Sequence, residues 1–275
     1  MTTSTEQLND AITALHGAAD AYNGKKAEID AAVTAALQAI PNMVRTYYVT
    51  QGSGDDAGPG TVADPLNSVG EALARIPGGG HGILYLEGGG FFEVGKPTGH
   101  RFIGAASVTF RSYGAGKATI SPNIATEPAD ATNSIAYGLI PTQQLCLFHF
   151  NDVIIDTRER FTGTTGIKAD YSGVICRGGG EYGAVRFEMT FNNVDFIIRD
   201  HPVWATFTHT YAWFSGCTVV LPNDYGMFNG GTSKTIILDV RSLTVPSGSV
   251  ITDLFNGVVN NTAAEAINVL SNIEF

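Results

Sequence analysis

One short stretch of the chain combines the residue types that acid–base chemistry needs. Asp195, Arg199, Asp200 and His201 follow one another along a strand-like run and the turn after it. A polysaccharide lyase could use such a basic side chain to remove the proton beside a uronate, while a cation holds the carboxylate. Asp195, Asp200 and His201 are therefore the candidate catalytic residues. Asp, His and Pro are also ordinary turn residues that satisfy backbone groups, so a purely structural role is the alternative.

Aromatic side chains crowd the segment that follows, HPVWATFTHTYAWF, which holds both tryptophans of the chain. Tryptophan and tyrosine bind sugars by stacking an apolar face while a polar tip forms hydrogen bonds. The same residues also serve as contacts between chains or as core. The candidates for contact with a carbohydrate or a partner chain are Trp204, Phe207, His209 and Tyr211.

Other chemistry has little support in the sequence. There is no nucleophile motif such as G-x-S-x-G and no Walker loop. Cys146, Cys176 and Cys217 lie in apolar runs away from any CxxC pair, which favours core positions. The Gly- and Asp-rich loop at 52–56 could offer oxygen ligands to calcium, but its spacing matches no EF-hand and its residues also suit a turn. We predict no metal and no cofactor.

The charge balance excludes some partners. The formal net charge is −10 and the isoelectric point is near 4.9, whereas binding to nucleic acid or to anionic membranes needs clustered Lys and Arg. No run approaches the roughly 20 apolar residues of a membrane span, and residues 2–7 are polar with no signal-peptide pattern. We therefore expect no nucleic acid partner, no membrane insertion, and synthesis in a reducing cytoplasm.

A four-residue phrase recurs along the second half of the chain. Each copy has a small or polar residue, an apolar one, a variable one and an apolar one, which is the period of a strand with one buried face. The last four copies start roughly 20 to 30 residues apart, as in a solenoid whose coils stack on each other. The copies begin at Ser107, Asp152, Asn193, Gly216, Ser242 and Asn272.

The repeat also bears on hydrolysis. Glycoside hydrolases need two carboxylates about 5 to 9.5 Å apart, and equivalent residues on neighbouring coils lie about 4.8 Å apart. At the outward third position of the phrase only Asp195 and Glu274 are acidic, and other coils separate them. The repeat therefore predicts no carboxylate pair on this face.

The first 42 residues have a different period. Apolar residues recur at alternating steps of three and four, which predicts a long helix with a heptad seam. Thr3 and Glu6 form a capping box at its start, and Pro41 is expected to end it. Lys26 on the seam, and Gly17 and Gly24 off it, weaken the pattern. The predicted oligomerisation residues are Leu8, Ile12, Leu15, Tyr22, Ile29, Val33 and Ile40. The alternative is a helix folded back on its own β-domain.

Residues 43–275 form the predicted β body. A strand at 45–50 and a Gly/Asp loop precede an amphipathic helix expected at 64–77, with Asp64 as N-cap and Pro65 as first helical residue. Leu66, Val69, Leu73 and Ile76 have helical spacing, and a buried strand follows at 83–86. A stack of coils needs such a cap, because its first coil exposes unpaired backbone groups.

The succession YYV, DPLNSVGEALARIPGGG and ILYLEGG resembles the N-terminal start of the pectate-lyase-like tail fibres and tailspikes of bacteriophages. The resemblance implies an all-β, right-handed parallel β-helix preceded by a long N-terminal helix, assembled as a homotrimer. It also implies a structural or receptor-binding role in the virion, with the N-terminal helix attached to other tail or baseplate proteins. A bacterial surface glycan is then the candidate ligand.

Two other functions remain at this stage. β-Helix proteins include polysaccharide lyases and hydrolases, so the main alternative is a tailspike depolymerase that cleaves bacterial surface polysaccharide. The predicted number of coils is small for an enzyme with a long sugar groove. A bacterial surface adhesin is disfavoured, because no signal peptide precedes the helix.

Overall fold

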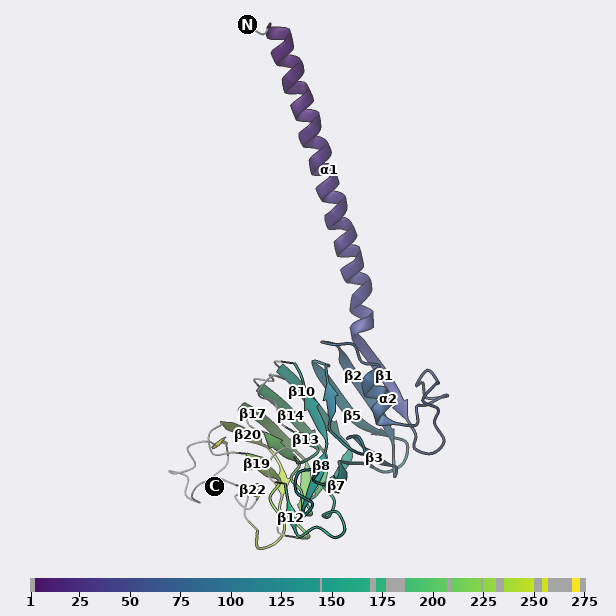
Figure 1. The fold of residues 1–275 in the computed structure, drawn as a ribbon, viewed down its shortest axis with the longest axis vertical. Helices are drawn as coiled ribbons and strands as arrows, with labels where there is room; N and C mark the ends of the chain where they lie inside the picture. The colour runs from purple at the N-terminus through teal and green to yellow at the C-terminus, as the bar shows by residue number, and fades with distance from the viewer. Residues whose placement is uncertain are drawn as a thin grey trace. The chain divides into compact units, whose positions relative to one another are not determined.

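The computed structural model describes residues 3–143, 145–168, 172–176, 186–206, 209–223, 225–230, 235–249, 254–256 and 269–272. The chain divides into two compact units, Met1–Met43 and Val44–Phe275. The sequence places this boundary one residue earlier. The first unit is a single long helix, and the second is built mainly of parallel β-strands (Figure 1).

The predicted N-terminal helix is confirmed as α1 (Ser4–Met43). Its capping box forms as expected, since the backbone N–H of Thr3 donates to Glu6 Oε2 at 2.7 Å. The predicted end at Pro41 is wrong: the helix runs on to Met43. A proline in the last turn removes one backbone hydrogen bond close to the end, where the helix is about to stop in any case.

The heptad seam of α1 is exposed within the single chain. Leu15 and Tyr22 keep 73% and 72% of their surface in solvent, and Leu8, Ile12, Ile29 and Val33 are also exposed. The side chain of Ile40 lies outside the described residues. An apolar stripe of this length has no partner within its own helix.

The body consists of three parallel sheets that the chain visits in the same order, again and again (Figure 1). We call one passage through the first, second and third sheet a coil. The first sheet contains β1 (Val44–Val49), β2 (His81–Glu87), β5 (Ser107–Tyr113), β10 (Leu145–Asn151), β14 (Arg186–Asn192), β17 (His209–Ser215), β20 (Ile236–Val240) and β23 (Val269–Ser271). The second contains β3 (Phe91–Glu93), β6 (Ala118–Ser121), β11 (Val153–Asp156), β15 (Asp195–Ile197), β18 (Cys217–Val220) and β21 (Leu243–Thr244). The third contains β4 (Arg101–Ile103), β9 (Leu139–Pro141), β13 (Ile175–Cys176), β16 (Trp204–Thr206), β19 (Phe228–Gly230) and β22 (Phe255–Asn256).

In three successive coils a single residue makes the bend from the first sheet to the second. At this position Asp152, Asn193 and Gly216 have φ of 55°, 54° and 64°. This left-handed region is open to glycine and is tolerated by Asn and Asp, but costs other residues roughly 1–2 kcal/mol. The first letter of the repeated phrase is therefore small or polar because it occupies the bend.

Four copies of the phrase stack in the second sheet as predicted. Ile154 pairs with Asp195, Asp195 with Thr218, and Thr218 with Thr244. The first copy is different, because the strand that begins at Ser107 belongs to the first sheet, and β6 takes the equivalent place in its coil. Asn272, the start of the last copy, follows β23 of the first sheet and donates to Asp239 at 3.3 Å.

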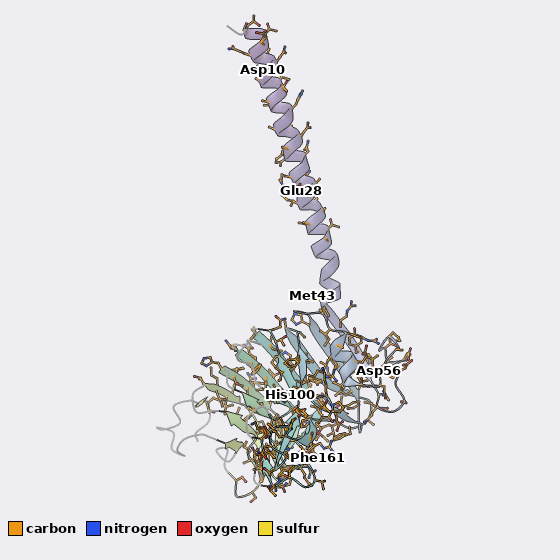
Figure 2. The ribbon with its side chains drawn as sticks, in the orientation of Figure 1. Asp10, Glu28, Met43, Asp56, His100 and Phe161 are labelled. Carbon is orange, nitrogen blue, oxygen red and sulfur yellow. The ribbon has the colours of Figure 1, made fainter. Side chains whose placement is uncertain are left out.

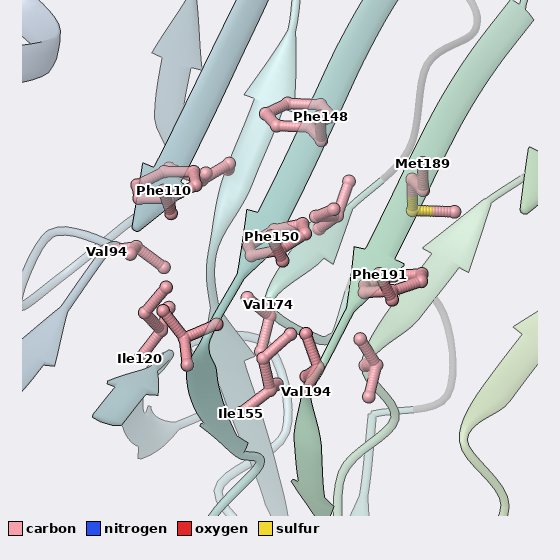
Figure 3. Close-up of a cluster of buried hydrophobic side chains, with 14 of the residues drawn as sticks. Val94, Phe110, Ile120, Phe148, Phe150, Ile155, Val174, Met189, Phe191 and Val194 are labelled. Carbon is pink, nitrogen blue, oxygen red and sulfur yellow. The ribbon is translucent and has the colours of Figure 1, made fainter. Parts of the chain in front are cut away.

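The core is a column of phenylalanine rings inside the coils. Phe110, Phe150, Phe191 and Phe214 occupy the same register position on β5, β10, β14 and β17. Successive ring centroids are 5.2, 5.3 and 5.0 Å apart and the rings are nearly parallel. Figure 3 shows Phe110, Phe150 and Phe191 in this ladder, with Phe148 and Met189 one layer away. The ladder fixes the register, because a shift of one residue would turn every ring to solvent.

The capping helix is shorter than predicted. Helix α2 covers Val69–Ala74, and its N-cap is Ser68, whose Oγ accepts a hydrogen bond from the Glu71 N–H. Asp64 lies in a bend before the helix, where its carbonyl accepts the N–H of Thr61, and Leu66 forms a bridge to Val49 of β1. Backbone pairing of Leu66 with the first strand overrides its helical spacing, so the helix starts after the N-cap Ser68 instead.

An excursion between the second and third sheets forms a small sheet of its own. Strand β7 (Asn123–Thr126) pairs antiparallel with β8 (Asn133–Tyr137), and β12 (Gly166–Ile167) adds to β8 in parallel. In the next coil the loop after β11 also lies between the second and third sheets in the chain order, and it carries β12. These two excursions lie between the sheets and add surface without interrupting the ladders.

The ladder gives a direct stability prediction. Phe191→Ala removes a fully buried ring that stacks on those of Phe150, Trp204 and Phe214. We therefore expect a loss of about 3–5 kcal/mol in the free energy of unfolding, measured by urea denaturation. The same substitution at the half-exposed Phe102 is the matched control and should cost well under half of that. Equal losses at the two positions would contradict the role of the ladder.

Candidate functional site

The three predicted catalytic residues do not come together. Asp195 faces outward from β15, where Lys117 Nζ donates to its Oδ2 at 2.8 Å and Thr218 Oγ1 to its Oδ1 at 2.7 Å. Burial opposes ionisation, but these two hydrogen bonds and the charge of Lys117 hold the pKa of Asp195 below its usual range. Its neighbours in register are Ile154 and Thr218, so the adjacent described coils offer no second carboxylate there.

Asp200 supports the turn after β15. Its Oδ2 accepts the backbone N–H of Arg160 at 2.9 Å, and its Oδ1 accepts Asn223 Nδ2 at 3.2 Å. The carboxylate is buried and also pairs with the Arg160 guanidinium at 3.4 Å. These contacts join loops of neighbouring coils. Asp200 therefore has the structural role in a turn that was the alternative to catalysis.

His201 is also a structural residue. Its ring is fully buried, with Nε2 3.1 Å from Ser134 Oγ and Nδ1 2.9 Å from Ser172 Oγ. The same serine oxygens accept the N–H groups of Phe161 and Ala136. The imidazole therefore clamps segments from successive coils and is closed off from any polymer in solvent.

The contact predicted at Trp204 is wrong. Only 1% of this residue is exposed, and it stacks in register on Ile175 and Phe228 inside the third sheet. Its Nε1–H has no hydrogen-bond partner among the described residues. The strand β16 turns the indole inward to continue the core, where its large apolar surface contributes more than a sugar contact would.

His209 and Tyr211 do lie on the surface, on the outward face of β17. Together with Arg186 and Ile237 they line a shallow cleft of about 340 Å³. Phe207 lies outside the described residues. Strict alternation along β17 places Trp213 on this same face, under the guanidinium of Arg241 at 5.4 Å from the ring centroid. The period-2 spacing of His209, Tyr211 and Trp213 in the sequence indicates that these three side chains share one face of the strand.

A second hollow lies beside the loop that follows β11. It has a volume of about 480 Å³ and lies against the outward side of the second sheet. We call it the arginine–carboxylate pocket. Its walls come from β3, β7, β11, the loop that follows β11, and the turn after β15. It is lined by Phe91, Ile124, Asp156, Arg158, Glu159, Arg160, Phe161, Thr162 and Arg199.

Ion pairs hold the polar groups of this pocket in place. Arg199 binds both oxygens of Asp156, with distances of 3.0 and 3.2 Å from Nε, and reaches Glu159 Oε1 at 3.4 Å. The hydrogen bonds that Arg199 donates to Asp156 raise the pKa of Arg199 above its ordinary value. Burial opposes this shift, and the negative charges of Asp156 and Glu159 add to it. Its guanidinium is therefore permanently charged.

Arg158 has an unusual backbone. Its φ is 65°, and its N–H donates to Asp156 Oδ1 at 2.9 Å. This conformation is strained for a side chain of this size. It places the guanidinium over the Phe91 ring, 5.3 Å from the centroid, where Nη1 donates to Glu93 Oε1 at 2.6 Å.

The loop at 52–56 uses its carboxylates internally. Asp56 Oδ1 accepts the N–H groups of Asn67 and Ser68, and its Oδ2 accepts Ser68 Oγ. Asp55 Oδ1 accepts the Ala57 N–H at 2.9 Å. No cluster of metal-ligating side chains occurs in the described ranges. Asp56, marked in Figure 2, thereby joins the loop to the start of α2.

The cysteines are core residues, as the apolar runs predicted. Cys146, Cys176 and Cys217 are buried free thiols. Burial raises the pKa of Cys146 to about 12, so its thiolate is not available for chemistry at neutral pH. No described helix is long and apolar enough to cross a membrane.

Comparison with known proteins adds little. No family model matches the chain, and no curated protein matches its sequence. Among solved structures, the chain is similar to a GH136 lacto-N-biosidase from Eubacterium ramulus, with 14% identity and a TM-score of 0.38. The match covers 73% of this chain and 43% of the other, so the chain spans less than half of that enzyme. A likeness this distant does not bear on activity.

The clamp around His201 predicts acid sensitivity. Burial lowers the pKa of His201 to about 4, Asp200 partly raises it, and Arg160 lowers it further. The unfolded chain has a pKa near 6.5, so the stabilisation is complete above pH 6.5 and is lost as the pH falls toward 4. Between pH 7 and 5 the loss from this one residue is about 2 kcal/mol. Urea unfolding at both values measures it.

A ring titration separates this effect from others. His100 is also buried and its pKa is lowered to about 4 by burial, so it adds a similar slope. The His201 ring signal in an NMR titration should stay that of a neutral imidazole down to pH 5, and His201→Gln should remove about half of the combined slope. Titration of His201 near pH 6.5 would refute the prediction.

Proposed function

We propose that this protein is a fibre- or spike-type component of a phage virion that assembles as a homotrimer and meets a bacterial surface glycan with its body. The observation that carries the proposal is the combination of an exposed heptad seam on α1 with a stack of parallel coils. The helix provides self-association and attachment to other virion proteins, and the body provides a rigid surface for recognition.

The order of the sheets supports a right-handed parallel β-helix. Each coil returns to the first sheet and adds a strand parallel to the previous one, and crossovers between parallel strands of one sheet are right-handed in about 98% of cases. The helix α2 packs beside β1 and β2 at the first coil. This is where a stack of coils needs its apolar interior covered.

The seam of α1 supports self-association. Its apolar residues fall at a and d positions over several heptads, and its side chains are exposed within one chain. Burying each such leucine or isoleucine between helices would contribute about 1.5–3 kcal/mol. Copies of the same helix have the complementary seam, so a second and third chain are the natural partners.

The outward face of β17 is the second contact that we assign to the trimer. The cleft beside His209 and Tyr211 is mainly apolar, and Leu145 and Ile237 on the same sheet are exposed. A flat face with an apolar cleft and aromatic side chains suits contact with another protein surface. This choice leaves the glycan to other parts of the body.

A depolymerase is the alternative. It is disfavoured by the separation of Asp195 from the buried Asp200 and His201. The displaced carboxylate pKa values among the described residues, at Glu6, Asp130 and Asp195, all move downward, which is the wrong direction for a general acid. Release of reducing or unsaturated ends from host capsule, abolished by Asp195→Asn, would instead favour the enzyme.

The trimer is tested by light scattering. We expect the full chain to have three times the mass of one chain, and the double variant Leu15→Lys with Ile29→Lys to dissociate, because six charges would meet along one seam. The matched control is Ala14→Lys with Ala27→Lys, which adds the same charge off the seam and should stay trimeric. A monomeric full chain would end the proposal of a trimer.

The place in the virion is tested by labelling. An antibody raised against residues 44–275 should decorate purified phage particles at the tail, because the helix attaches the body there. Particles of a phage that lacks this gene serve as the control. Absence of label on intact particles, with the protein present in infected cells, would contradict a virion role.

A further inference from the structure

The arginine–carboxylate pocket has the size of a ligand site. Its volume of about 480 Å³ lies within the range of roughly 300–1,000 Å³ that is usual for small-molecule sites. Strands β3, β11 and the turn after β15 contribute to it from different coils, while the loop at 158–162 forms its rim. The rigid ladder thus fixes its floor, and the loop shapes its opening.

Charge is nearly balanced within the pocket. Arg158 pairs with Glu93, Arg160 with Asp200, and Arg199 with Asp156 and Glu159. Every guanidinium therefore has a carboxylate beside it. A strongly anionic ligand would have to compete with these fixed carboxylates, and a cation would meet the guanidinium groups.

Donors and acceptors nevertheless remain for a ligand. Among its described contacts, Arg158 donates through Nη1 alone, and a guanidinium carries five N–H groups. Glu159 is mostly exposed and uses only Oε1 toward Arg199. Such groups are pre-oriented by their ion pairs, so a hydroxyl-rich neutral ligand could bind without ordering long side chains.

An apolar surface completes the pocket. Phe161, labelled in Figure 2, is 44% exposed and lines the pocket together with Phe91 and Ile124. A pyranose ring has hydroxyl groups around its edge and a face of C–H groups. Aromatic rings bind that face, while charged and polar groups bind the edge.

We infer that the arginine–carboxylate pocket binds a neutral pyranose unit of a polysaccharide. The inference deepens the proposed function by giving the chemistry of the glycan contact, and it rests on that function only for the bacterial source of the sugar. Its residues are separate from the α1 seam and from the face of β17. A monomeric chain would refute the trimer and leave sugar binding in this pocket intact.

Saturation-transfer NMR on the full chain tests the inference directly. The probes are the methyl glycosides of glucose, galactose, mannose and rhamnose, with methyl glucuronide as the anionic comparison. We expect saturation transfer to at least one neutral glycoside, strongest at its C–H face, and little change on adding salt, because no net charge is neutralised. No transfer to any neutral glycoside would overturn the inference, and so would binding of the glucuronide alone that salt abolishes.

Variants locate the binding to this pocket. Phe161→Ala should weaken the bound glycoside roughly tenfold through loss of the stacking face, and Phe161→Tyr should restore it. Arg158→Ala should weaken it as well. The matched control is Phe102→Ala, an exposed phenylalanine of the third sheet, which should bind like the parent. Undiminished binding in Phe161→Ala and Arg158→Ala, with circular dichroism unchanged, would overturn the assignment.

Discussion

In-register stacking of the coils is the constraint on which the rest of the body depends. Each strand of the first sheet pairs along its length with the equivalent strand of the next coil, and the phenylalanine ladder lies behind this pairing. The single left-handed residue at Asp152, Asn193 and Gly216 then sets where the second sheet begins. Because side chains alternate along a strand, one residue gained or lost at this bend would exchange the interior for the exterior in that coil.

The same constraint positions the functional surfaces. Outward-facing residues at equivalent positions of successive coils lie in columns. The carboxylates and guanidinium groups at the end of the second sheet therefore lie beside loops of neighbouring coils. Asp156 ends β11 and immediately precedes the loop that carries Arg158. The pocket thus arises where a regular ladder stops and a longer connection starts, which is where binding residues are expected on a rigid scaffold.

Much of the fold could be predicted from the sequence, because its signals are local and periodic. The alternation in the repeated phrase predicted four strands of the second sheet, and the three-four spacing predicted α1. The start of α2 was wrong because the backbone pairing of Leu66 with β1 is a tertiary contact that spacing does not report. The residues of the candidate site were harder to predict from the sequence. Trp204 and Trp213 have similar neighbours in sequence, yet opposite faces, and only the register of their strands separates them. The arginine–carboxylate pocket joins residues from β3 to the turn after β15, a juxtaposition that depends on how many residues each coil contains.

The connections around each coil differ in length, and this has an evolutionary consequence. In the three coils that bend at Asp152, Asn193 and Gly216, the connection between the first and second sheets is only one or two residues long. The connection from the second sheet to the third is longer in two coils, where it carries β7 and β8 or the loop at 157–165. In the coils with this short bend, we therefore expect insertions and deletions in the long connection and not at the bend. If the binding specificity of relatives of this protein changes, we expect it to change by exchange of these long connections, with the ladder beneath them inherited intact.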